Sequence, residues 1–178
     1  MNSSRRWTWL PLVVILLVVL ASWWASLPPT PKPATAPPDQ FSAERAMAHL
    51  KELARAPHPA GSSENDRVFQ TLISILRDLN VEVETIEGPV RHGDRGLVWE
   101  RAVLARVRGT DPSGKAIAVD AHFDSVPYGP GAADDLSGGV AMLEVCRALK
   151  SQPPLRHDVI FVFSDQEEVG GDGARAFT

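Results

Sequence analysis

The stretch from Lys115 to Phe163 constrains the fold most, because it predicts a strand, a helix and a second strand in that order. Lys115 to His122 indicates the first strand, and Ser137 to Leu149 has the apolar spacing of a helix. Val159 to Phe163 is an uninterrupted apolar run, typical of a strand covered on both faces. This order predicts a βαβ unit with parallel strands and a right-handed crossover. The expected fold class is therefore α/β.

Further elements are expected upstream of this unit. Ser42 can cap one helix and Ser63 a second, and the prolines and a glycine between them prevent one continuous helix. Val81 to Ile86 and Ala102 to Val107 show the two-residue period of strands. The residues from Gly88 to Gly96 are predicted to form a turn region.

Acidic side chains and a histidine stand where the strands of the βαβ unit end. In open α/β sheets, ligands bind beyond the carboxyl ends of the strands. The first strand ends with a histidine and an aspartate, two aspartates precede the helix, and two glutamates follow the second strand: His122, Asp124, Asp134, Asp135, Glu167 and Glu168. This arrangement predicts a functional site at that edge of the sheet.

His122 and Asp124 share one face of an extended chain, because side chains two residues apart point the same way. A histidine that binds a metal usually donates its other N–H to a carboxylate, which fixes the tautomer. Asp124 is placed for that supporting role. Taken alone, the pair also fits a solvated strand end.

Asp134 and Asp135 precede Ser137, the predicted cap of the helix, where carboxylates also favour the helix dipole. The surrounding glycines favour a ligand site as the alternative, since they let the backbone approach a ligand closely. A carboxylate here could bridge two zinc ions, which lie about 3.5 to 4 Å apart in such sites.

Glu167 and Glu168 follow the buried second strand, although adjacent glutamates are also common on solvated loops. The two side chains diverge at a strand end. One can therefore bind a metal while the other acts as a general base on the metal-bound water.

Three strings in the sequence resemble one peptidase family. HFDSVPYGPGAADDLSGGVAMLE, followed by VIFVFSDQEEVGGDGARAF, is similar to family twenty-eight of the metallopeptidases, the di-zinc aminopeptidases and their relatives. HPAGSSENDRVFQTLISILRDLNVEVE resembles the segment before that domain in membrane-bound members, and its His58 resembles a family feature outside the ligand set. The resemblance covers Ala43 to Phe177. It implies a three-layer sandwich with a mixed, largely parallel central sheet.

The resemblance also implies site roles. It implies three metal ligands: His122, Asp134, which bridges two zinc ions, and Glu168. It also implies a catalytic pair, with Glu167 as the general base and Asp124 as the acid that supports His122. The remaining family ligands, an aspartate and a histidine, lie well downstream of the glutamates. We therefore expect residues 39–178 to be the N-terminal, truncated part of a peptidase domain, inactive alone.

The N-terminal residues predict a membrane anchor. Residues 7–27 carry no charge, and a helix of that length spans about 31 Å at about 1.5 Å per residue, enough for a bilayer core. A cleaved signal peptide is the alternative, but tryptophans occupy the stretch where small residues would be needed. An arginine pair places residues 1–6 in the cytoplasm. The proline-rich residues 28–38 predict an extended stalk.

Residues 39–178 carry 15 basic and 22 acidic side chains, a net charge of −7, which argues against nucleic acid as a partner. The expected function is that of a zinc-dependent exopeptidase that hydrolyses peptides through metal-activated water, and the preferred type of exopeptidase is an aminopeptidase. A relative with carboxypeptidase or glutaminyl cyclase chemistry and a non-catalytic peptidase-like binding domain stay open. The anchor predicts a single-pass membrane protein with its peptidase domain outside the cytoplasm. A bacterial periplasm is preferred to an endoplasmic-reticulum lumen as the compartment. No oligomeric state is predicted.

Overall fold

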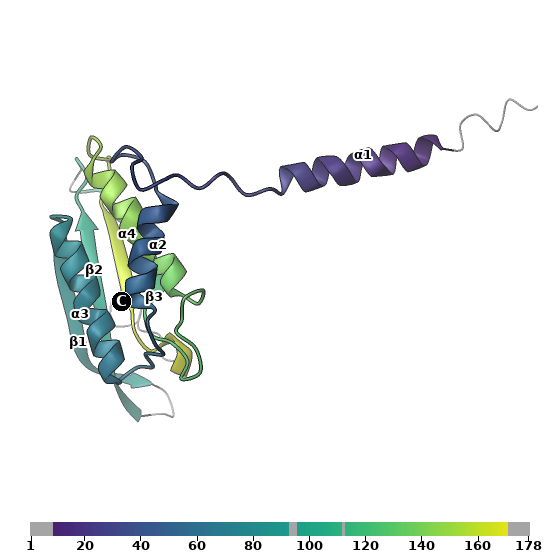
Figure 1. Ribbon diagram of the computed structural model, residues 1–178. Helices are drawn as coiled ribbons and strands as arrows, with labels where there is room; N and C mark the ends of the chain where they lie inside the picture. The colour runs from purple at the N-terminus through teal and green to yellow at the C-terminus, as the bar shows by residue number, and fades with distance from the viewer. Residues whose placement is uncertain (1–8, 93–95, 112, 171–178) are drawn as a thin grey trace, which may run out of the picture. The chain divides into compact units, whose positions relative to one another are not determined.

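The computed structural model describes residues 9–92, 96–111 and 113–170, and it divides into two compact units. The first unit, Met1–Pro31, holds helix α1 (Leu10–Ala25). The second unit, Lys32–Thr178, holds the other described helices and strands (Figure 1). The predicted cytoplasmic residues 1–6 lie outside the described part of the chain.

α1 is apolar along its whole length, and every one of its side chains is exposed. Within the described ranges, no helix combines the length and the apolar character that crossing a bilayer requires. The anchor over residues 7–27 stays a prediction.

A four-stranded mixed sheet organises the second unit. Its strands are β1 (Glu82–His92), β2 (Gly96–Val107), β3 (Ile117–His122) and β4 (Val159–Ser164), in the spatial order β1-β2-β4-β3. β3 and β4 pair in parallel and are connected through α4 (Leu136–Lys150). The predicted α/β class and βαβ unit are therefore confirmed.

The β1–β2 hairpin is longer than the sequence pattern predicted. Both strands extend into the expected turn region and pair as far as His92 and Gly96. Pro89 is tolerated because β1 is an edge strand, where a missing N–H need not cost a ladder hydrogen bond. β2 is antiparallel to both β1 and β4. The sheet is mixed, as expected, but its described strands are not largely parallel: a short hairpin makes β1 and β2 antiparallel, and β2 is also antiparallel to β4.

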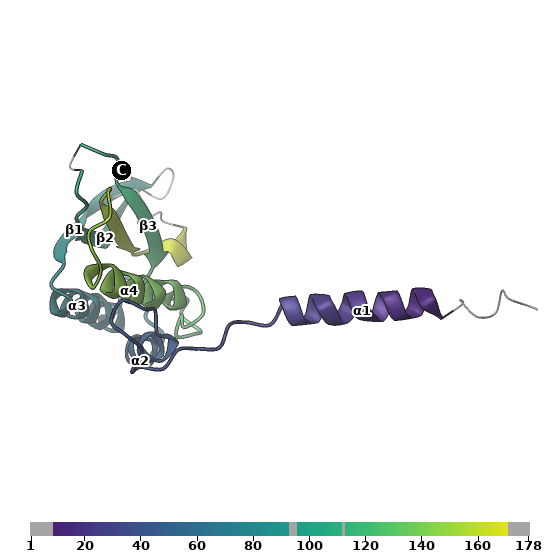
Figure 2. The same cartoon turned by 90° about the horizontal axis from the view of Figure 1, so that it is seen from above.

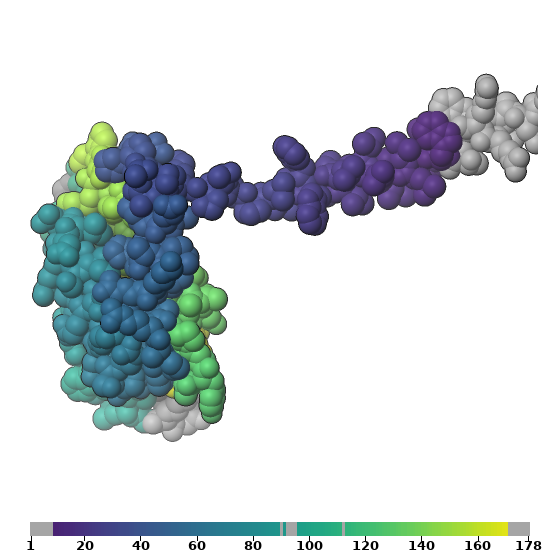
Figure 3. Space-filling model, in the orientation of Figure 1, coloured from purple at the N-terminus to yellow at the C-terminus, as the bar shows by residue number. Residues whose placement is uncertain are grey.

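Three helices lie together on one face of this sheet: α2 (Ala43–Leu53), α3 (Ser63–Asp78) and α4 (Figure 2). Alternate strand residues meet apolar helix residues to form the core, among them Val103, Phe161, Phe163, Leu72, Leu76 and Leu143. In the space-filling view α2 lies between α3 and the loop that follows β3 (Figure 3). The described elements thus form two of the three layers that the resemblance implied.

Serine side chains start two of these helices. The Ser42 hydroxyl accepts the N–H of Arg45, which confirms the predicted cap of α2. α3 is capped by Ser62 rather than the predicted Ser63, since the Ser62 hydroxyl accepts the N–H of Asn65.

The chain from Lys32 to Gln40 packs on the rest of the second unit, although the composition of residues 28–38 predicted an extended stalk. Arg45 and Arg147 donate to its main-chain carbonyl groups, those of Ala34, Ala36, Pro38 and Gln40. The buried Glu144 carboxylate pairs with both guanidinium groups, at 3.2 Å from Arg45 Nε and 2.8 Å from Arg147 Nε. We call Arg45, Glu144 and Arg147 the arginine clamp. It can bind this segment because prolines leave main-chain carbonyl groups without regular partners.

Candidate metal-binding and catalytic site

The predicted site residues lie at the edge of the sheet where β3 and β4 end. The two strands are parallel, with His122 opposite Ser164, so the residues that follow them meet at this edge. Glu167 and Glu168 begin a single 3₁₀ turn, η3 (Glu167–Val169). The residue before it, Gln166, has a left-handed backbone (φ 69°), which turns the chain sharply after β4.

The imidazole of His122 lies between two aspartates. Its Nδ1 atom is 3.1 Å from the Asp124 carbonyl oxygen and 3.4 Å from Asp124 Oδ1. Its Nε2 atom is 3.3 Å from Asp134 Oδ1 and 3.8 Å from Glu167 Oε2. When the Nδ1–H donates to Asp124, the lone pair of Nε2 is available to a metal ion.

The Asp124 carboxylate also joins the two strand ends. It is fully buried, and its oxygens accept the backbone N–H groups of Glu167 at 3.1 Å and Glu168 at 3.2 Å. The residue predicted to support His122 therefore also holds the main chain of both glutamates.

The charges around His122 change its proton affinity. Burial by itself would lower the pKa of His122, but hydrogen bonding and attraction to Asp124, with a smaller contribution from Asp134, raise the pKa to about 9. A metal ion that binds Nε2 must displace the proton that Nε2 carries in the charged imidazolium. Protons therefore compete with the metal ion at low pH.

Asp134 and Asp135 have different positions, and a cis peptide bond joins them. The Asp135 side chain caps α4 by accepting the N–H of Gly138 at 3.1 Å, in place of the predicted cap Ser137. The Ser137 hydroxyl instead donates to the Ala133 carbonyl at 2.9 Å. The Asp134 side chain is 85% exposed and faces His122. The cap role thus belongs to Asp135, and the ligand role of Asp134 stays a prediction.

One pair of donors, His122 Nε2 and Asp134 Oδ1, suits zinc in kind and in spacing. Zinc binds imidazole nitrogen and carboxylate oxygen, and two ligands on one tetrahedral ion lie about 3.4 Å apart. The 3.3 Å between His122 Nε2 and Asp134 Oδ1 matches that spacing. In the residues that the structure describes, however, no three His, Cys, Asp or Glu side chains are grouped closely enough to hold a metal ion. Glu168 meets this site through its backbone N–H.

A buried polar network behind the site was missed by the sequence reasoning. Asp165 is 1% exposed and accepts hydrogen bonds from Asn65 Nδ2 at 3.1 Å and Arg101 Nε at 3.2 Å. Burial raises the pKa of Asp165, while the Arg101 guanidinium opposes that rise. The only sequence signal was the place of Asp165 between a buried strand and the glutamates. Asn65 and Arg101 gave none.

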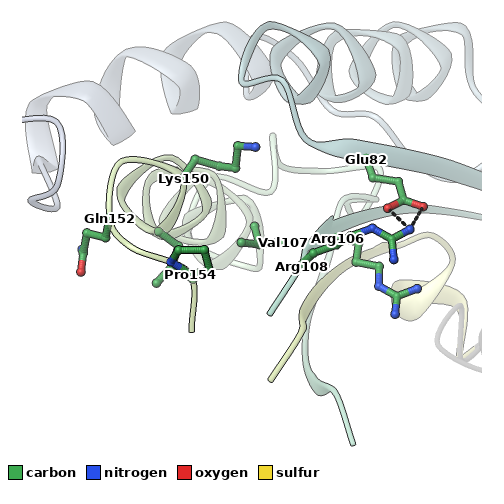
Figure 4. Close-up of a pocket in the computed structure, with 8 residues that line it drawn as sticks. Glu82, Arg106, Val107, Arg108, Lys150, Gln152 and Pro154 are labelled. Atoms are coloured by element: carbon green, nitrogen blue, oxygen red, sulfur yellow. Dashed lines mark hydrogen bonds and ion pairs between the residues drawn. The ribbon is translucent and has the colours of Figure 1, made fainter. Parts of the chain in front are cut away.

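A hollow of about 350 Å³ is lined by residues that precede and follow the glutamates in the chain, but not by the glutamates themselves. Gln166 and Val169 line it on either side of the glutamates in the chain, and Trp99, 59% exposed, lines it from β2. A second hollow, of about 300 Å³, lies at the opposite end of the sheet, around Arg106, Arg108 and Lys150 (Figure 4). No predicted site residue lines this second hollow, so it is separate from the candidate site. Its Arg108 is paired with Glu82.

Comparison with known proteins identifies the family. Residues 102–178 match the family described as Peptidase family M28. The vacuolar membrane protease of Candida albicans (strain SC5314 / ATCC MYA-2876) is 34% identical over an alignment of 179 positions that covers 97% of this chain and 21% of that protein. The chain belongs to peptidase family M28. The vacuolar membrane protease of Yarrowia lipolytica is 32% identical over 79% of the M28 chain and 17% of its own length. The chain thus spans about a fifth of the length of these relatives.

Solved structures share the mixed α/β fold of this M28 chain. Porphyromonas gingivalis glutaminyl cyclase superimposes with a TM-score of 0.61 and 26% identity, over 70% of this chain and 45% of that one. The zinc aminopeptidase of Bacillus subtilis gives a TM-score of 0.64 at 14% identity, over 73% of this chain and 63% of that one. A Zn-dependent exopeptidase from Parabacteroides distasonis gives 0.58 at 22%, over 70% and 46%. The last two show the fold alone.

Proposed function

We propose that this M28 chain contributes to the active site of a zinc-dependent exopeptidase, an aminopeptidase first. The observation that carries the proposal is the His122 imidazole, which Asp124 holds from behind while Asp134 and Glu167 face its Nε2 atom at 3.3 and 3.8 Å. A single solvated strand end would not need a fully buried carboxylate to orient its histidine.

His122, Asp134 and Glu168 would hold zinc, with Asp134 bridging two ions. The resemblance to the family implies two more ligands, an aspartate and a histidine, downstream of Glu168 in sequence. Bound zinc supplies a Lewis acid for the scissile carbonyl and lowers the pKa of the attacking water. Asp124 would keep the His122 proton on Nδ1, which would leave the Nε2 lone pair available to the ion.

Glu167 is the proposed general base. Its side chain is 61% exposed, so a peptide can reach it, while its backbone N–H is fixed by Asp124. Its carboxylate takes the proton of the attacking water and delivers it to the leaving amine.

An acyl-transfer relative is the second candidate. The similarity to Porphyromonas gingivalis glutaminyl cyclase, which is 26% identical over the matched region, favours it. A cyclase would release ammonia from an N-terminal glutamine without cleaving a peptide bond. The same zinc ligands could serve both reactions, so the product decides between them.

We further propose that residues 7–27 anchor the protein in a membrane, with the peptidase domain outside the cytoplasm. The support is the uncharged segment and the name of its relatives, vacuolar membrane protease. Those relatives are fungal. Their similarity does not support the predicted preference for a bacterial periplasm over the lumen of an internal compartment.

The test uses zinc-loaded protein expressed from its complete reading frame. Leucine amide and an N-terminal glutaminyl peptide are offered separately, and the products are identified by mass spectrometry. Hydrolysis of leucine amide that a chelator abolishes and zinc restores is the expected result. Cyclisation without hydrolysis would favour the second candidate, and zinc-loaded protein without either reaction would contradict both.

A further inference from the structure

Asn65 connects the two loops that carry the candidate site. It lies in the first turn of α3 and is fully buried. Its Nδ2 atom donates to Asp165 Oδ1 at 3.1 Å and to the His58 carbonyl at 3.4 Å, and its Oδ1 atom accepts from Arg101 Nη2. The amide thus uses both its donor and its acceptor groups.

On one side, this connection reaches the chain before the glutamates. Asp165 accepts from Asn65, from Arg101 Nε at 3.2 Å and from the N–H of Gln166 at 3.0 Å. Its own N–H donates to the Arg101 carbonyl at 3.1 Å. Both the side chain and the backbone of Asp165 are therefore fixed, two residues before Glu167.

On the other side, the connection reaches the chain after Asp124. The His58 N–H donates to Ser125 Oγ at 2.8 Å, and the Ser125 N–H donates back to the His58 carbonyl at 3.3 Å. Ser125 is 1% exposed and follows Asp124 directly. The His58 carbonyl that accepts from Asn65 is the one that receives this N–H.

The two loops are therefore joined twice. Asp124 makes the direct link by accepting the N–H groups of Glu167 and Glu168. The second link runs through Asn65, from Ser125 and His58 to Asp165. One link alone would leave the loops free to pivot about it, whereas two links fix their relative orientation.

We propose that Asn65 is a positioning residue for Glu167, because its amide joins the chain after Asp124 to the chain before the glutamates. The catalytic part of this inference rests on the proposed peptidase function. Only an uncharged amide supplies both a donor for Asp165 and an acceptor for Arg101. An aspartate at this position would lose the donor and bring a second carboxylate to Asp165.

The experiment compares Asn65→Asp, Asp165→Asn and the double variant, in zinc-loaded protein from the complete reading frame. Asn65→Asp should lower kcat by about 10²-fold, the cost of a displaced catalytic group, while KM and zinc content stay near those of the unchanged protein. The double variant again pairs one amide with one carboxylate, but it leaves the His58 carbonyl without its side-chain donor, so the link is not rebuilt and kcat should stay low. Ile73→Val, a core change in the same helix, is the control for a loss of helix packing alone.

A second measurement is independent of activity. In the 178-residue chain, amide hydrogen exchange of Glu167 and Glu168 reports whether Asp124 still holds their N–H groups. Asn65→Asp should speed this exchange at least about tenfold, and Ile73→Val should not. Unchanged exchange and kcat in folded Asn65→Asp would overturn the positioning role, as would equal effects of Ile73→Val. Missing peptidase activity in the unchanged protein would instead refute the proposed function, while the exchange result stands by itself.

Discussion

The Oδ1 atom of buried Asp124 accepts the backbone N–H of Glu167 at 3.1 Å. The same carboxylate lies 3.4 Å from His122 Nδ1. One side chain therefore sets the position of a proposed zinc ligand and of the proposed general base, which come from different strands. Removing its charge should affect metal binding and geometry together.

Asp124→Asn tests this relationship. The amide keeps one acceptor oxygen but cannot accept both N–H groups, and it no longer holds the His122 proton on Nδ1 by charge. Zinc affinity of the complete protein, measured by competition with a chromogenic chelator, should fall about 10 to 100-fold. Asp120→Asn is the control, because Asp120 lies in β3, just before Asp124 in the chain, and contacts Ser164 Oγ at 3.3 Å instead. Equal losses in the two variants would contradict the supporting role.

The two neighbouring glutamates should respond differently to substitution. Glu167→Gln keeps the shape but removes the base, so zinc content should stay near normal while kcat falls by about 10²-fold or more. Glu168→Ala removes a proposed ligand, so zinc content and activity should fall together. Metal analysis and steady-state kinetics on the complete protein measure both. Loss of zinc in Glu167→Gln alone would reverse the two roles.

The arginine clamp should make stability depend on pH. Burial alone would raise the pKa of Glu144, but Arg147, the Ser42 N–H and Arg45 hold it below its ordinary value of 4.5. The ionised carboxylate therefore stabilises the folded chain above about pH 4.5, and this contribution is lost as the pH falls through the lower folded pKa. Glu144→Gln should cost about 2 kcal/mol at pH 7 and flatten the acid loss of stability, as urea unfolding between pH 3 and 7 would show. The same pH slope in both proteins would contradict this assignment.

Gly109 should not tolerate a methyl group. A Cβ atom there would lie 2.5 Å from the Arg156 carbonyl oxygen and 2.5 Å from the His157 carbonyl carbon, both of which are main-chain atoms that cannot easily move. Gly109→Ala should lower the free energy of unfolding by about 1 to 3 kcal/mol. Gly88→Ala is the matched control, since a Cβ atom at Gly88 meets nothing within 4 Å. Urea unfolding that ranks the two variants equally would refute the steric argument.

The proposed anchor predicts how the protein partitions. The 178-residue chain should stay with membranes after alkaline carbonate extraction, and deletion of residues 1–27 should release it, because the apolar segment carries the attachment. A cysteine-free reporter fused after Pro38 should be active only outside the cytoplasm. Membrane retention of the deleted chain, or reporter activity in the cytoplasm, would count against the anchor and its orientation respectively.

The βαβ unit and the edge of the sheet that carries the acids were determined by the sequence itself. Apolar periodicity is a local property, and the rule that parallel strands end at a common edge then brings His122 near Glu167. The motif residues also indicated the family. The hairpin length was underestimated because Gly88 and Pro89 indicated a turn, whereas pairing with β2 continues through them.

Only the tertiary structure decided the contacts between segments that are distant in sequence. Which of two identical neighbours, Asp134 or Asp135, caps α4 depends on the path of the loop, which no residue pattern encodes. Asn65 and Asp165 are 100 positions apart, and the clamp residues Arg45 and Glu144 are 99 apart. Such pairs follow no local period. Their partners are chosen when packing buries polar groups that must then find hydrogen bonds across the fold.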